Sequence, residues 1–128
     1  MRASACWARQ PVQCAGTTTL GFIAARSAQT FRRAVLVDIW DACVAGQETT
    51  LEQRARCRLA ASFAVDSARQ ALDLMYRAGG TTSSKRTHRL ARCWRDLQVV
   101  GQAASVAPDW YGLSGKALLG LEPGPRLV

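Results

Sequence analysis

Histidine is almost absent from this chain, and its cysteines show no metal-ligand spacing. His88 is the single histidine among 128 residues, so a histidine-rich metal site is excluded. Five cysteines are present, without the close Cys-x-x-Cys spacing typical of zinc sites and disulfide frameworks. They are Cys6, Cys14, Cys43, Cys57 and Cys93. We therefore expect free thiols, a reducing cytoplasmic compartment and no bound metal.

Long apolar runs are missing as well. No segment approaches the roughly 20 apolar residues that a membrane-spanning helix needs, and no period of about 20–50 residues repeats. Aromatic residues make up 7% of the chain, whereas alanine is abundant, which favours helices over a β-sandwich. A chain of 128 residues is long enough for one domain with a core but too short for two.

Acidic residues are scarce, since 9 Asp and Glu stand against 17 Lys and Arg and give a formal net charge of +8. The basic residues are nearly all Arg and lie along the chain without a basic run, a pattern that GC-rich coding sequence produces by itself. We therefore expect no nucleic-acid partner and no membrane partner. Residues 1–37 are Arg-rich and lack acids, which is typical of an organellar transit peptide. A poorly ordered N-terminus of biased composition is the favoured alternative, because the periodic apolar pattern begins within this segment.

A first helix is expected near residues 19–45. Apolar side chains recur at 3.6-residue spacing from Leu20 to Ala42. The threonines before Leu20 can cap the helix start, because a threonine oxygen accepts a free amide of the first turn. Gly46 is a natural stop. Residues 1–18 lack this periodicity and are expected to form an unstructured or divergent leader.

A second helix is expected near residues 50–78. Two overlapping capping boxes, which begin at Thr49 and Thr50, mark its start, and Gly79-Gly80 ends it. A series of alanines on its apolar face would let neighbouring helices approach closely. The opposite face carries charges at spacings of three and four residues. It comprises Arg58, Ser62, Asp66, Arg69, Asp73 and Arg77.

The second half of the chain is expected to add two more helices. One runs from about residue 86 to 107 and stops before Pro108, which cannot donate the next amide hydrogen bond. A short one follows near 109–119. Four helices with short connections and no strand signal predict an all-α, up-and-down four-helix bundle. We place this domain at 19–123 and a tail at 124–128.

Three segments resemble one family. The runs "LEQRARCRLAASFAVDSARQALDLMYRAGG", "RCWRDLQVVGQ" and "YGLSGKALLGLEP" are similar to the C-terminal helical domain of the acyl-CoA dehydrogenase superfamily, and most to its flavin-dependent monooxygenases. The resemblance covers roughly residues 20–123. It implies that the chain is a fragment, because relatives also have an N-terminal helical domain and a middle β-domain. A truncated gene, a misassigned start and a decayed paralogue would each account for this.

The resemblance assigns cofactor contacts to Gly79, Gly80 and Arg95. In relatives the glycine pair lies near the adenine end of a flavin, FAD or FMN, that is bound chiefly by a neighbouring subunit. The guanidinium can reach a pyrophosphate there. The structural alternatives are a helix C-cap for the glycines and an ion pair for Arg95-Asp96. Tyr76 stands where acyl-CoA dehydrogenases proper often have Gln, which favours the monooxygenase branch or weakens cofactor binding.

The resemblance also indicates that the family's acid-base residue is missing. The monooxygenases have a Gln-His pair beside the flavin and many acyl-CoA dehydrogenases use a nearby Glu, whereas this chain has Gln102 followed by Ala103 and Ala104. A methyl group cannot take or donate a proton. His88 does not replace it, because it lies about four helical turns away, roughly 22 Å along a helix. We therefore expect no catalytic residue in this chain.

Together these points predict a C-terminal helical fragment of an acyl-CoA dehydrogenase-like flavin-dependent oxidoreductase or monooxygenase. It would contribute to the oligomer core, a homotetramer in relatives, and to the flavin site. We expect it to be inactive alone and to retain no flavin, although intact relatives bind FAD or FMN and some need a flavin reductase partner. The alternative is a non-enzymatic oligomerising helical module.

Overall fold

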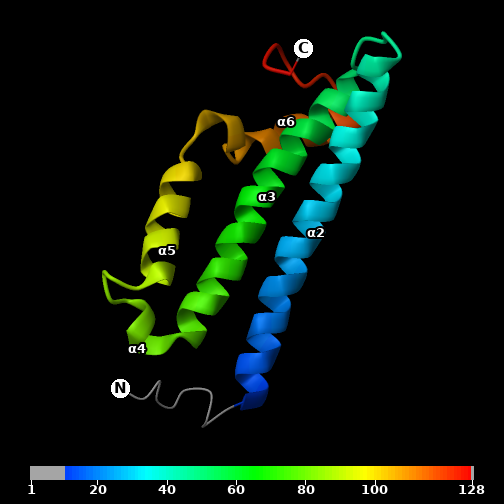
Figure 1. Cartoon of the computed structure of the whole chain (residues 1–128). Coiled ribbons are helices and arrows are strands. Elements are labelled where there is room, and N and C mark those ends of the chain that lie inside the picture. Colours follow the sequence, from blue (N-terminus) through cyan, green and yellow to red (C-terminus); the bar gives the residue numbers. More distant parts are fainter. Residues whose placement is uncertain (1–10, 128) are drawn as a thin grey trace.

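The computed structural model describes residues 11–127, with side chains described from Ala15 onward. Within this range the chain is helical and contains no strand, which confirms the all-α class (Figure 1). The elements are α2 (Pro11–Val44), α3 (Leu51–Ala78), α4 (Gly80–Ser83), α5 (Arg89–Val100), the 3₁₀ turn η1 (Ala104–Val106) and α6 (Asp109–Leu118).

Helix α3 is the central element of the fold. It packs against α2 on one side and α5 on the other, and it also contacts α4, η1 and α6. Figure 1 shows α2, α3 and α5 side by side, with α6 crossing α3 near its N-terminal end. The three longer helices therefore form a layer in which only α3 is flanked on both sides.

Helix α2 is longer than expected. It is already helical at Pro11, so the leader predicted over residues 1–18 is wrong for residues 11–18, while residues 1–10 lie outside the described range. The threonines that were expected to cap the helix instead continue it. The Thr19 hydroxyl donates to the Ala15 carbonyl at 2.9 Å. No cap is needed at this point, because the helix has already begun at Pro11.

The start of α3 follows the second of the two predicted capping boxes. The Gln53 amide donates to the Thr50 hydroxyl at 3.1 Å, and the Thr50 amide donates to the Gln53 side chain at 3.0 Å. These two hydrogen bonds satisfy two amides that the helix start leaves without backbone partners. At its other end the helix stops at Ala78, as the glycine pair indicated.

Helix α5 is shorter than predicted, because it ends at Val100 rather than at Ala107. Gly101 caps it, and the guanidinium of Arg69 from α3 occupies the space where a Cβ of residue 101 would lie. Ala103 then adopts an extended backbone (ψ 134°). The helical pattern of the sequence continues beyond Gly101, but the Gly101 backbone packs against this guanidinium and the α-helix ends there.

Small side chains fill the interior, and large apolar side chains lie outside. The buried positions are mostly alanine and serine: Ala28, Ala42, Ala55, Ala60, Ala91, Ser62, Ser67, Ser83 and Ser114, with Val35, Trp110 and Leu127. Exposed apolar side chains on α2 include Leu36, Trp40 and Val44. Small residues let helices approach closely, as where Gly21 lies against the Ala71 backbone.

One compact apolar cluster forms where α6 crosses α3. Trp110 of α6 packs with Ala55 of α3 and with Leu127 of the C-terminal segment, and Leu51 and Leu113 extend the cluster. The predicted tail thus returns to the helices and contributes a buried side chain.

Candidate functional site

The glycine pair forms a tight turn between α3 and α4. Gly79 keeps a right-handed helical backbone, and Gly80 takes the left-handed one (φ +57°) that glycine adopts without a steric penalty. A Cβ on Gly79 would lie 3.0 Å from the Ser83 Cβ. The buried Ser83 hydroxyl lies 2.7 Å from the Tyr76 carbonyl oxygen and 2.6 Å from that of Gly80, and donates to these acceptors. The turn therefore requires both glycines for structural reasons, and both remain exposed.

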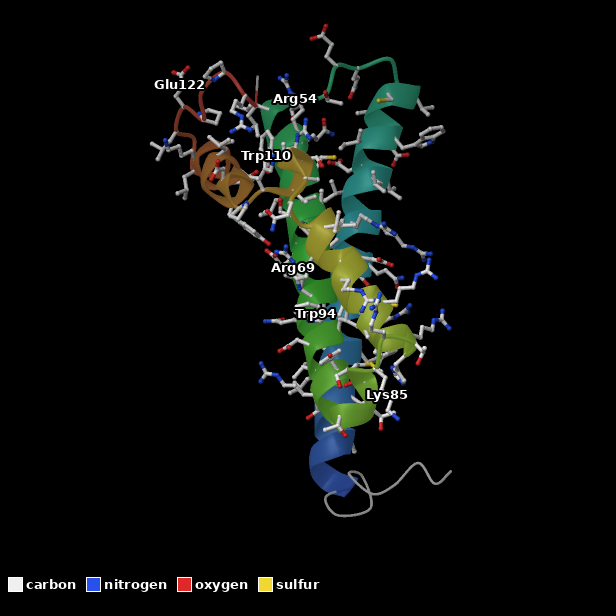
Figure 2. The ribbon with its side chains drawn as sticks, turned by 90° about the vertical axis from the view of Figure 1, so that its left-hand side faces the viewer. Arg54, Arg69, Lys85, Trp94, Trp110 and Glu122 are labelled. Atoms are coloured by element: carbon white, nitrogen blue, oxygen red, sulfur yellow. The ribbon has the colours of Figure 1, made fainter. Side chains whose placement is uncertain are left out.

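Arg95 lies exposed on α5 without the predicted ion pair to its neighbour. Among the side chains that the structure describes, no carboxylate lies within ion-pair distance of it, and Asp96 instead lies 3.7 Å from the Arg92 guanidinium one turn earlier. Of the Arg95-Asp96 unit, therefore, only Asp96 takes part in an ion pair within the described residues. Trp94 packs 6.1 Å from the Tyr76 ring, centroid to centroid, and connects α5 to the end of α3 (Figure 2).

Ala103 and Ala104 lie between α5 and α6, where Ala104 begins the 3₁₀ turn η1, and not on the long α-helix that was expected. Both are exposed, and so is Gln102. The Ala104 carbonyl accepts a 2.7 Å hydrogen bond from the Trp110 indole, so its backbone positions α6 while its methyl group supplies no proton chemistry. This turn and the Gly79-Gly80 turn lie at opposite ends of α5 in Figure 1, and the structure does not bring the two together.

A polar network connects α3 to the turn and to α6, and its link between α3 and α6 has no local signal in the sequence. The Tyr111 hydroxyl donates to the Asp66 carboxylate at 2.7 Å, and the same carboxylate lies 3.6 Å from the Arg69 guanidinium. Burial, the hydrogen bond to Asp66 and the negative charge of Asp66 together raise the pKa of Tyr111 to about 12. The charged face of α3 suggested the Asp66–Arg69 pair, but Tyr111 lies 45 residues further along the chain.

His88 caps α5 rather than contributing to a reaction. Its Nδ1 accepts the Leu90 amide at 3.2 Å, and its backbone is extended as an N-cap requires. The thiols of Cys43, Cys57 and Cys93 are free, while Cys6 and Cys14 lie outside the residues with described side chains.

The described part of the chain has neither a metal-ligand cluster nor a membrane-spanning helix. No three His, Cys, Asp or Glu side chains gather in a way that would hold a metal ion. None of its helices combines the length and the apolar character needed to cross a membrane. Chemically, the positions described above offer an exposed glycine turn, an unpaired guanidinium and a phenol that stays protonated at neutral pH.

A solved structure has the same fold. The 3-HSA hydroxylase from Rhodococcus sp. RHA1 superposes with a TM-score of 0.87 at 23% sequence identity, over 99% of this chain and 33% of that chain. This chain therefore spans about a third of the length of that protein. No curated protein sequence gives a significant match. Residues 4–108 match the family described as the C-terminal domain of acyl-CoA dehydrogenase, and the chain belongs to that family.

Proposed function

We propose that this chain is the C-terminal helical domain of a flavin-dependent oxidoreductase or monooxygenase, and that it is inactive by itself. The family match supports this, and so does the fold shared with a hydroxylase of which the chain spans 33%. The domain would act in the cytoplasm as part of a homotetramer, supplied with reduced flavin by a reductase where the relatives need one.

The exposed apolar face of α2 is the observation that carries this proposal. Leu36, Trp40 and Val44 follow one another at four-residue spacing, so they lie on one face of the helix; we call these three residues the α2 stripe. Their exposed fractions are 51%, 69% and 72%. Exposed apolar surface of this kind marks a protein contact. We infer that the stripe packs against another copy of the chain in an oligomer core.

The residues expected to contact a flavin are compatible with an edge contact. A Cβ built on Gly80 meets nothing within 4 Å, so its backbone is open to an approaching group. Arg95 is exposed and free to bind a phosphate through its guanidinium fork. When bound, a flavin supplies the redox chemistry. This chain would contribute the open backbone of Gly79 and Gly80 and the positive charge of Arg95, while other parts of the assembly would enclose the cofactor.

Inactivity follows from the side chains at the turn after α5. Ala103 and Ala104 are methyl-bearing, and Gln102 hydrogen-bonds but does not act as a base near neutral pH. The raised pKa of Tyr111, about 12, keeps its proton in place at neutral pH. No group at this turn is therefore suited to transfer a proton at neutral pH.

An absorbance spectrum of the purified full chain tests the proposal. After incubation with FAD or FMN and gel filtration, we expect no stoichiometric flavin in the protein fraction and no reductase-dependent oxygenation of an aromatic substrate. Tightly bound flavin with turnover would contradict the proposed inactivity. Adding the remaining two-thirds of a related enzyme as a separate polypeptide should restore flavin retention if the domain assignment is correct.

The second candidate is a non-enzymatic oligomerising module, which the α2 stripe also supports. Sedimentation velocity distinguishes the two. A monodisperse oligomer that never gains flavin, even with the complementary domains present, favours the module. A chain that retains flavin only in the complemented complex favours the enzyme domain.

A further inference from the structure

A cavity of about 330 Å³ lies beside the start of α3, a volume within the usual range of small-molecule pockets. Three of its lining residues are arginines: Arg54 and Arg58 from α3, and Arg126 from the C-terminal segment. Ile39 and Leu127 provide an apolar wall. Figure 2 shows Arg54 and Trp110 at the same end of the molecule.

The cavity is strongly cationic, because none of its lining residues is acidic. Arg126 lies 3.8 Å from Asp109, which is outside the lining. Among the described side chains, Arg54 and Arg58 form no ion pair. Three guanidinium groups around one cavity repel each other, and a bound anion would relieve that repulsion.

Two of the three guanidiniums are held in place before any ligand binds. Arg58 lies 4.7 Å and Arg126 lies 5.3 Å from the centroid of the Trp110 ring. Trp110 is itself buried and donates its indole hydrogen bond to Ala104. Cation–π contacts to a fixed ring reduce the side-chain entropy lost on binding.

The N-terminal end of α3 adds to the positive potential of the cavity. The cavity is lined by Thr49, immediately before the capping residue Thr50, where the amides of the first helical turn favour an anion. Glu52 in the same turn is the competing negative charge, and it is paired with Arg56. The net field at the cavity therefore attracts an anion.

We propose that this cavity binds a small phosphate monoester with an apolar body. A phosphate group carries a charge of about −1.5 to −2 and three acceptor oxygens, which suits several guanidinium forks better than a single carboxylate does. The apolar body would lie against Ile39 and Leu127. The inference does not depend on the proposed flavin role, because 25 residues of α3 separate Arg54 from Gly79, about 37 Å along a helix.

Isothermal titration of the full chain with phenyl phosphate tests the proposal. We expect saturable one-to-one binding that is tighter than for inorganic phosphate, which lacks the apolar body, and tighter than for benzoate, which lacks the second charge. Equal affinities for all three anions, or no saturable binding of phenyl phosphate, would overturn the proposal.

Substitutions locate the site. Arg54→Gln should weaken phenyl phosphate binding about tenfold, the loss of one charge-assisted hydrogen bond, and Arg54→Lys should weaken it less. Arg89→Gln, which removes the same charge from an exposed position at the start of α5 that is outside the cavity lining, should leave the affinity unchanged. Because Arg54 is exposed, its replacement should preserve the fold, which circular dichroism would verify. Equal losses in Arg54→Gln and Arg89→Gln would show non-specific charge attraction and contradict the assignment.

Discussion

The Tyr111 hydroxyl donates a 2.7 Å hydrogen bond to the Asp66 carboxylate and thereby joins α6 to the middle of α3. Burial and this carboxylate raise the pKa of Tyr111 from 10.0 to about 12. The folded state therefore holds the phenol proton more tightly than the unfolded chain does. The resulting stabilisation is complete below about pH 10 and is lost as the pH rises from 10 towards 12.

The first prediction concerns this pH window. The free energy of unfolding of the unmodified chain should fall more steeply between about pH 10 and pH 12 than that of Tyr111→Phe, which has no proton to lose. Urea titrations at several pH values give both curves. Parallel curves across the window would show that the Asp66 contact does not hold the proton.

The second prediction concerns Gly101 and Arg69. A methyl group at residue 101 would overlap the Arg69 guanidinium, so Gly101→Ala should destabilise the chain by about 1 kcal/mol. In an Arg69→Ala background the same change should become neutral or stabilising, because alanine loses less backbone entropy than glycine. A double-mutant cycle from urea unfolding measures the coupling. Equal effects in both backgrounds would contradict the contact.

A third prediction compares two glycines with opposite backbone requirements. Gly80→Ala should cost about 1 kcal/mol, because its φ of +57° is strained for a residue with a Cβ. Gly112→Ala lies within α6, where a Cβ meets nothing within 4 Å, and should stabilise by roughly 0.5–1 kcal/mol. Thermal melts of the two variants should therefore shift in opposite directions.

The fourth prediction separates the two overlapping capping boxes. Thr50→Ala removes the hydroxyl that accepts the Gln53 amide and should cost about 1 kcal/mol. Thr49→Ala, one residue earlier, should change stability by less than about 0.5 kcal/mol. If Thr49→Ala were instead the more destabilising change, α3 would begin in solution with the capping box of Thr49.

The fifth prediction concerns the α2 stripe. Trp40→Ser should shift the sedimenting species towards monomer, because it removes the largest exposed side chain of the stripe from the inferred contact. Leu119→Ser is the matched control, since Leu119 is similarly exposed but follows α6. Loss of the oligomer in the control alone would place the contact elsewhere.

Local signals predicted most of the fold. The ends of α3 follow from Thr50 and the glycine pair, and the all-α class follows from periodicity and the lack of strand signals. The end of α5 was predicted too late, because the apolar pattern continues past Gly101 and the packing of Arg69 against Gly101 joins two different helices. The start of α2 was missed for a different reason: threonines that resemble a cap can also bond back within a helix.

The candidate site was predictable only where chain neighbours decide the geometry. The Gly79-Gly80 turn is such a case, since its shape depends on Ser83 four residues away. That Ala103 and Ala104 stand at the family's acid-base positions stays a prediction, while the turn on which they lie is joined to α6 by the Trp110 indole. The pairing of Tyr111 with Asp66 connects residues 45 positions apart, and no sequence pattern within either helix indicates it.

The interior of small side chains reverses the usual response of a protein to mutation. Truncation to alanine, the standard way to find a core, changes little at positions such as Ala55, Ala60 or Ser62, because there is almost nothing to remove. Enlargement there is the damaging change, since an added methylene forces close-packed helices apart. A mutational scan of this chain should therefore find its core from the residues that tolerate no growth.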